Sequence, residues 1–142
     1  MKFNRRAREQ EGQAVVEFAA IMIPFAVLFI LALDGALFFF GYVTAAHAVR
    51  EGTRCGTVGG SAANIETKVL ADLPGTGKSV TVTRTDVNSD GVKGIGDRIT
   101  VSATWTYNWV TPLSLFGIPD GTTRTYTADM RLETDRADRA CT

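Results

Sequence analysis

The sequence is poor in the side chains that build active sites and metal centres. Its 142 residues include one histidine, His47, and two cysteines, Cys55 and Cys141. No second histidine can complete a metal cluster, and the two cysteines stand too far apart for a CxxC redox or zinc motif. No Ser/His/Asp or Cys/His set can be assembled around His47, and the sequence has no phosphate-binding loop. We therefore expect a protein without enzyme activity.

The chain also lacks an excess of charge of either sign, because fifteen basic side chains balance fifteen acidic ones. A nucleic-acid-binding protein normally carries a clustered basic face, since neutralising phosphates supplies most of its affinity. The single basic cluster stands directly before an apolar run and consists of Lys2, Arg5, Arg6 and Arg8. We therefore expect no nucleic-acid partner.

That apolar run is the most informative feature present. Between Phe18 and Phe40 only Asp34 is charged. About 23 residues at ~1.5 Å per residue make a helix of about 34 Å, enough to cross a hydrocarbon core ~30 Å thick. The alternative is a secretory signal peptide, but the run exceeds the roughly 7–15 apolar residues of such a signal, and no small-x-small cleavage site follows it. We expect a single-pass membrane helix with its N-terminus in the cytoplasm, by the positive-inside rule.

Three regions follow from this interpretation. Residues 1–12 are a basic cytoplasmic leader, residues 13–55 form one long helix with its membrane span at about 18–40, and residues 56–142 form an extracytoplasmic domain. Beyond the span the helix becomes amphipathic. Its polar stripe consists of His47, Arg50, Glu51 and Arg54, and the apolar residues away from that stripe are Val43, Ala46 and Val49. Three glycines then end the helix, Gly56, Gly59 and Gly60.

The predicted fold class of the extracytoplasmic region is α+β. Ser61 is placed to cap a short helix over Ala62–Leu73, with Ile65 and Val69 on its apolar face. After Pro74 the hydrophobic period changes to two, which predicts half-buried antiparallel strands. These strands lie around Val80–Val82, Ile99–Trp109 and Tyr126–Leu132, the first two as a hairpin and the last two joined by the loop Thr111–Thr123. We expect the apolar face of this three-stranded sheet to pack on the outer half of the long helix.

The two cysteines both fall in the region expected outside the membrane, where disulfides persist. We predict a Cys55–Cys141 bond that ties the end of the chain to the end of the long helix. In the chain-entropy model, closing a loop of this length contributes on the order of 4 kcal/mol. The alternative is a pair of unpaired thiols.

One acidic stretch fits the pattern of a calcium loop. Asp86, Asn88 and Asp90 alternate before Gly91, and Asp97 takes the twelfth position, where a glutamate is usual. Strands instead of helices are expected on both sides, and Asn, Asp and Gly are also the residues of any hairpin tip. Calcium is therefore the one cofactor that the sequence suggests, with a plain hairpin tip as the alternative.

The start of the apolar run resembles the processing site of type IV pilins. A basic leader ends in Gly12, Glu17 follows five residues later, and the apolar run begins at once. The resemblance implies that a prepilin peptidase cuts between Gly12 and Gln13 on the cytoplasmic face. The cut would leave an amine on Gln13 one helical turn from the Glu17 carboxylate, which could pair with it or with the amine of a neighbouring subunit. The alternative is that Glu17 is only a flanking charge at the membrane interface.

A second resemblance covers more of the chain. The segment from Arg8 to Ala19, then Ile23-Pro24, Asp34, and Arg50-Glu51-Gly52-Thr53-Arg54 at the helix end are similar to the TadE-like family, pseudopilin-type proteins of bacterial tight-adherence pilus loci. Met130-Arg131-Leu132-Glu133 matches the M-R-x-E stretch of that family, whereas Gly35 and Gly41 depart from its usual glycine position. The resemblance implies a minor pseudopilin or assembly component in the bacterial cytoplasmic membrane or in an extracellular filament. Its implied partners are other pilin or pseudopilin subunits, the prepilin peptidase and an inner-membrane assembly platform.

Two further features of the span bear on assembly. A carboxylate at Asp34 costs a few kcal/mol inside an apolar span and is often functional. We favour a pairing role for it within an assembly, and the alternative is that it reaches out to the membrane surface. Pro24 lacks an N–H and should weaken the helix locally.

A different class of function also fits the sequence. The chain could be an uncleaved, membrane-anchored binding module. Its contact surface would then be the strand with Trp105 and Trp109 or the loop Thr111–Thr123, and its target a partner protein or the cell wall.

Overall fold

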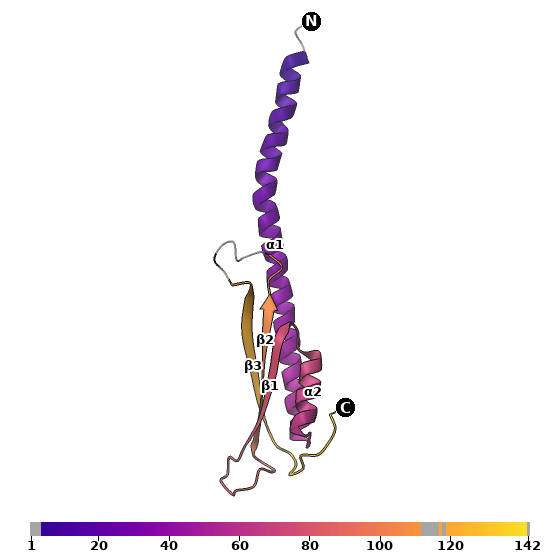
Figure 1. Cartoon of the computed structure of the whole chain (residues 1–142), viewed down its shortest axis with the longest axis vertical. Helices are drawn as coiled ribbons and strands as arrows, with labels where there is room; N and C mark the ends of the chain where they lie inside the picture. The colour runs from indigo at the N-terminus through magenta and orange to yellow at the C-terminus, as the bar shows by residue number, and fades with distance from the viewer. Residues whose placement is uncertain (1–3, 112–116, 118, 142) are drawn as a thin grey trace. The chain divides into compact units, whose positions relative to one another are not determined.

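The computed structural model describes residues 4–111, 117 and 119–141. Two helices and three strands follow one another along the chain (Figure 1): α1 (Asn4–Thr57), α2 (Ala62–Asp72), β1 (Thr76–Thr85), β2 (Arg98–Asn108) and β3 (Gly121–Arg131). The chain divides into two compact units, residues 1–36 and 37–142, which are described separately. The predicted α+β class, with a long N-terminal helix and a three-stranded antiparallel sheet, is confirmed.

Helix α1 begins at Asn4, well before the predicted start at Gln13. The leader is rich in Arg, Glu, Gln and Ala, which are good helix formers, and a single glycine at position 12 costs only about 1 kcal/mol. Pro24 lies inside the helix. The helix is long and apolar enough to cross a membrane, and large side chains of the first unit such as Phe18, Ile23 and Leu28 are each more than 60 % exposed.

The end of α1 follows the glycine signal in the sequence. The helix continues through Gly56 and ends at Thr57. Gly59 has a φ of +98°, in the left-handed region that favours glycine. Its N–H donates to the Gly56 carbonyl at 3.2 Å, and the Gly60 N–H donates to the Cys55 carbonyl at 2.9 Å. These bonds satisfy carbonyls that a helix end leaves without an intrahelical partner.

Helix α2 confirms the predicted cap and apolar face. The Ser61 hydroxyl accepts a hydrogen bond from the Asn64 N–H at 3.2 Å. Ile65 and Val69 are fully buried. The helix ends at Asp72, one residue before the predicted end, because Leu73 adopts an extended conformation (φ −71°, ψ 132°), as residues before a proline usually do.

The sheet has the order β1-β2-β3, and both pairs are antiparallel, which confirms the predicted hairpin of the first two strands. Val101 in the central strand stands between Val82 and Ala128. On the opposite face, hydroxyls of β2 and β3 pair across the strands at 2.8–3.0 Å: Ser102 with Thr127, Thr104 with Thr125, and Thr106 with Thr123. Of the predicted loop, residues 121–123 belong to β3, and residues 112–116 and 118 lie outside the described residues.

The apolar face of the sheet is covered by α2 and the C-terminal part of α1, which lie side by side. The core draws on all of these elements: Ala45, Ala48, Val49, Ile65, Val69, Leu73, Ile99, Val101, Ala103, Trp105 and Leu132. Two residues expected on apolar faces are exposed. Val43 is 51 % exposed, and Met130 is 36 % exposed because β3 is an edge strand whose inner face is only partly covered.

Candidate functional site

The predicted processing site lies entirely within α1. Gln13 and Glu17 are exposed and stand one helical turn apart, and the Gln13 amide Nε2 donates to the Glu17 Oε1 at 3.0 Å. A Cβ added at Gly12 would meet nothing within 4 Å. Residue 13 therefore already reaches the Glu17 carboxylate through its side chain. Cleavage after Gly12 stays a prediction, as does the pairing of Glu17 with an amine.

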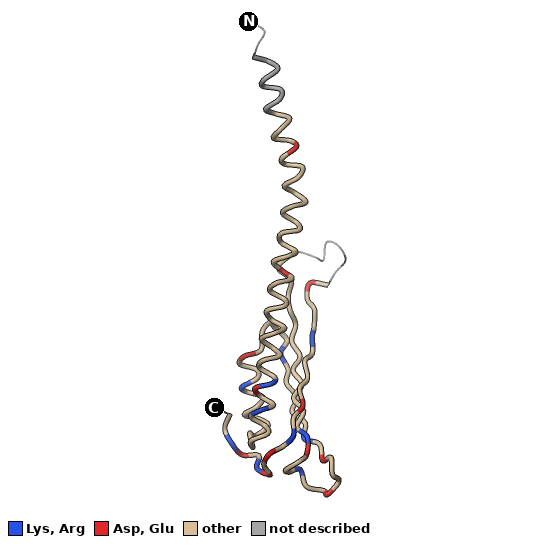
Figure 2. The backbone as a smooth tube through the Cα atoms, turned by 180° about the vertical axis from the view of Figure 1, so that it is seen from behind, with Lys and Arg blue, Asp and Glu red and all other residues tan. Residues whose placement is uncertain are grey.

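Charged residues are sparse in α1 between Gly12 and Arg50 and frequent around α2 and the sheet (Figure 2). Glu17 and Asp34 are the two acidic residues between Gly12 and Arg50. Asp34 is 2 % exposed and has an interaction partner within the chain. Its pairing with another subunit therefore stays a prediction, and that pairing would require exchange of the partner that Asp34 has in the single chain.

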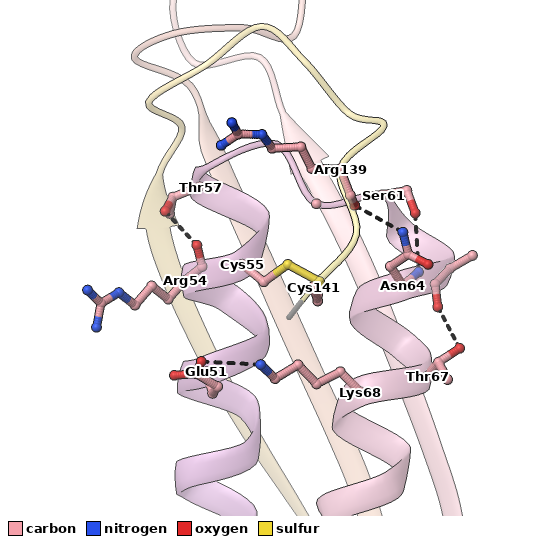
Figure 3. Close-up of a disulfide and its surroundings, with 12 residues drawn as sticks. Glu51, Arg54, Cys55, Thr57, Ser61, Asn64, Thr67, Lys68, Arg139 and Cys141 are labelled. Carbon is pink, nitrogen blue, oxygen red and sulfur yellow. Dashed lines mark hydrogen bonds and ion pairs between the residues drawn. A yellow bond between two sulfur atoms is a disulfide. The ribbon is translucent and has the colours of Figure 1, made fainter.

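The Arg50-Glu51-Gly52 motif connects α1 to both other layers of the second unit. The Arg50 guanidinium donates to the Tyr126 hydroxyl of β3 at 2.8 Å and lies 5.7 Å from the centre of the Tyr126 ring. The Glu51 carboxylate pairs with the Lys68 ammonium of α2 at 3.3 Å (Figure 3). The predicted polar stripe is exposed as expected, including His47. Two residues of this stripe, Arg50 and Glu51, also connect α1 to β3 and α2.

The glycine of this motif allows the two helices to approach closely. A Cβ at Gly52 would overlap the Val69 side chain of α2 and come within 3.3 Å of Ile65. One turn later, a Cβ at Gly56 would overlap Ile99 of β2. In the sequence the motif stood out only as a family resemblance, and its packing role was missed. The available signal was the i, i+4 spacing of small residues, which places them on one face of the helix.

The predicted disulfide is present and is part of a strap formed by the C-terminal segment. Cys55 and Cys141 are bonded across a sequence separation of 86, with Cα atoms 5.6 Å apart (Figure 3). The Arg139 N–H donates to the Gly59 carbonyl at 2.8 Å, and the Ser61 N–H donates to the Arg139 carbonyl at 3.2 Å. The segment therefore closes over the end of α1 and the start of α2.

The residues of the predicted calcium loop are engaged with the backbone of the loop. Asp86 accepts from the Ser89 and Gly91 N–H groups at 2.7 and 2.9 Å, and Asp90 accepts from the Val92 N–H at 2.8 Å. These are the local bonds that Asp typically makes in turns. Within the described part of the chain, no three His, Cys, Asp or Glu side chains converge to hold a metal ion. Calcium binding stays a prediction. Comparing the melting temperature with and without a chelator tests it.

Asp97 has a separate role at the base of the hairpin. It is 1 % exposed, and its two carboxylate oxygens accept from the Val87 and Gly94 N–H groups, each at 2.9 Å. The bond from Val87, followed by those from Gly94 and Asn88, lowers the pKa of Asp97 below its ordinary value, against the opposing effect of burial. The ionised carboxylate is therefore the form that holds the hairpin closed.

This lowered pKa predicts an acid-sensitive hairpin. A carboxylate whose pKa is lower in the folded chain stabilises the fold above its unfolded pKa of about 3.9, and that contribution is lost as pH falls through the folded value. When the pH is lowered under about 4, we expect the melting temperature of the wild type to decrease. The melting temperature of the Asp97→Asn variant should decrease less over the same pH range. Exposed Asp138, which sits outside the hairpin, provides a control in Asp138→Asn. Equal acid profiles for Asp97→Asn and the wild type would contradict the prediction.

The strand proposed as a contact surface is mostly internal. Trp105 is 1 % exposed and belongs to the core, so the expectation that it contacts a partner is wrong. The period-two pattern placed Trp105 on the apolar face, and that face is covered by the helices. Trp109 is half-buried, and its indole N–H donates to the Thr122 hydroxyl at 3.2 Å.

Comparison with known proteins bears on the first third of the chain. Residues 12–54 match the family model described as TadE-like protein. The match begins at Gly12 and ends at Arg54, so it contains Glu17, Asp34 and the Arg50-Glu51-Gly52 motif, and it confirms the resemblance noted in the sequence. No curated protein and no solved structure matches the chain.

Proposed function

We propose that this chain, TadE-like over residues 12–54, is a minor pseudopilin or assembly component of a bacterial tight-adherence pilus or a related secretion system. The observation that carries the proposal is the family match, which starts at the glycine of the predicted processing site. The family consists of pilus-assembly components and is not known for enzyme activity. The exposed apolar side chains of the first unit support the same conclusion, because they suit either a bilayer or a bundle of similar helices.

The proposed mechanism starts with cleavage after Gly12. The reaction would leave Gln13 with a free, charged amine beside the apolar phase. In the cleaved chain Glu17 is the nearest carboxylate along the helix, and its contact with the Gln13 side chain supports the idea that this turn brings it within reach of that amine. A charged pair in apolar surroundings needs close geometry to offset desolvation. Pairing with the amine of a neighbouring subunit would therefore favour one axial position in the filament over others.

The proposed topology has the leader in the cytoplasm and the domain of residues 56–142 outside the cytoplasmic membrane. The helix supplies a candidate anchor. The Cys55–Cys141 bond supports this orientation, since disulfides persist outside the reducing cytoplasm. Pilin or pseudopilin subunits, the prepilin peptidase and an inner-membrane assembly platform are the partners that this arrangement requires.

The mature N-terminus tests the proposal. We expect intact-mass analysis of membrane fractions to show a chain that begins at Gln13 in cells with the prepilin peptidase and at Met1 in cells without it. Gly12→Leu should block the cut. Gly35→Leu is the matched control, because both glycines lie in α1 and a Cβ added at either would meet no neighbouring atom within 4 Å.

Glu17→Gln separates cleavage from assembly. We expect this variant to be cut normally, because the scissile bond is intact, and to be lost from sheared filaments or from the assembly complex. Glu66→Gln, on exposed Glu66 of α2, should keep both properties. A full-length mass in the presence of the peptidase would instead support an uncleaved anchored domain. Normal incorporation of Glu17→Gln would contradict the proposed charge pairing.

A further inference from the structure

An aromatic cluster joins the end of the apolar run in α1 to the end of the sheet. Phe38 stacks on Trp109 with ring centres 5.8 Å apart and meets Tyr107 edge-on at 5.5 Å. Tyr107 and Trp109 contact each other at 5.2 Å. Tyrosine and tryptophan are enriched where a membrane meets water, because one part of each ring system is apolar and the other can form hydrogen bonds.

A hollow of about 240 Å³ opens beside this cluster and is lined by Phe38, Phe39, Tyr42 and Arg124. Its apolar side chains are accessible, since Phe39 is 69 % exposed and Tyr42 is 40 % exposed. The hollow is therefore an apolar surface with a single cation at its edge.

Arg124 supplies that cation. Its guanidinium lies 5.7 Å from the centre of the Phe38 ring and, among the described residues, makes no ion pair. Arg124 is exposed on β3. A guanidinium held over an aromatic ring and not engaged by a carboxylate keeps its donors available for an anion, and phosphate is an anion that arginine binds with two donors at once.

We propose that this hollow seats a phospholipid of the outer leaflet, with the headgroup phosphate on Arg124 and the upper acyl chain against Phe38 and Phe39. The inference rests on the proposed membrane anchoring. A lipid is the occupant that the observations favour, because the hollow begins where the apolar run ends, and its cation would stand at the depth of the phosphates. An anionic headgroup such as phosphatidylglycerol should bind best, since no ion pair with a described residue offsets the charge of Arg124.

The binding would hold the end of the sheet at the membrane surface. Trp109 would then lie near the headgroups, whereas Trp105 is sealed in the core. The chain has two tryptophans. In a Trp105→Phe variant, Trp109 is therefore the one remaining tryptophan, and tryptophan fluorescence reports its surroundings.

The experiment uses the full chain in vesicles of phosphatidylcholine with or without phosphatidylglycerol, with bromine placed high or low on the acyl chains. We expect high bromines to quench Trp109 more strongly than low ones. Native mass spectrometry of the chain without the Trp105 substitution should show retained phosphatidylglycerol. Arg124→Gln should reduce that retention about fivefold, the effect of one charge near an anionic surface. Arg124→Lys should retain most of the charge effect.

Arg131→Gln is the matched control, because Arg131 lies on the same strand at its other end and should leave lipid retention unchanged. Equal quenching by high and low bromines, or equal lipid retention in the Arg124→Gln and Arg131→Gln variants, would overturn the proposal. If the quenching of Trp109 decreases as the protein-to-lipid ratio is raised, a second copy of the chain occupies the hollow. That result would also overturn the proposal. Resistance of the chain to carbonate extraction tests membrane anchoring independently of lipid binding in the hollow. The outcomes of the lipid experiment do not depend on leader cleavage or on filament assembly.

Discussion

Replacing both Cys55 and Cys141 by serine is expected to lower the free energy of unfolding of the 37–142 unit by about 2–5 kcal/mol. The bond closes a sequence separation of 86, so its loss frees a large part of the chain in the unfolded state. In the folded state it also holds the C-terminal strap, which otherwise depends on backbone bonds to Gly59 and Ser61. Small domains depend strongly on such cross-links.

Denaturant unfolding of the full chain in detergent measures this loss. Wild-type protein treated with reductant should approach the stability of the double variant, because both lack the same bond. Thr134→Ser changes a residue of the strap and leaves the disulfide intact, so it serves as a mild control. A double variant as stable as the oxidised wild type would show that the strap is held by its backbone contacts alone.

Gly52→Ala is expected to destabilise the 37–142 unit by about 1–3 kcal/mol, the usual cost of overpacking a core. A Cβ at this position would overlap the Val69 side chain, and Val69 is fully buried and cannot turn away into solvent. The loss should appear although alanine is favoured over glycine in a helix by about 1 kcal/mol. Thermal or denaturant unfolding, followed by circular dichroism, measures the change.

Gly41→Ala is the matched control. Gly41 is also buried within α1, but a Cβ there would meet Pro74 at an ordinary contact distance of 3.7 Å. We expect this variant to be neutral or more stable by up to about 1 kcal/mol. A double-mutant cycle with Val69→Ala should show a favourable coupling, since the smaller partner makes room for the new methyl group. Equal effects of Gly52→Ala and Gly41→Ala would contradict the close helix contact.

Two expectations from the sequence were wrong because local patterns carry limited information. The long helix was expected to start at Gln13, yet α1 starts at Asn4, because the helix propensity of the leader outweighs one glycine. Met130 fits the alternating pattern of β3 but remains partly exposed, since an edge strand is covered less than a central one. Periodicity identifies the face on which a side chain lies. It does not show how completely that face is covered.

The Arg50-Glu51-Gly52 motif illustrates what the sequence leaves undecided. Its spacing and its exposure as part of a polar stripe could be predicted. Its partners could not, because Tyr126 lies 76 residues away and Lys68 lies 17 residues away. Likewise, the order of Asp86, Asn88 and Asp90 fits a cation loop as well as a hairpin tip, and the observed bonds to backbone N–H groups exist only once the turn has formed.

The long apolar helix, the two periodicities that yield α2 and the sheet, and the candidate processing site from Gly12 to Glu17 all follow from the order of residues alone. Each of these depends on how single residues partition between water and apolar surroundings, or on neighbours within one helical turn. Three other features became visible only in the folded chain: Arg50 bonds to Tyr126, Gly52 lies against Val69, and Arg124 stands over Phe38. Those contacts depend on the register and spacing of elements far apart in the chain, which no local pattern records.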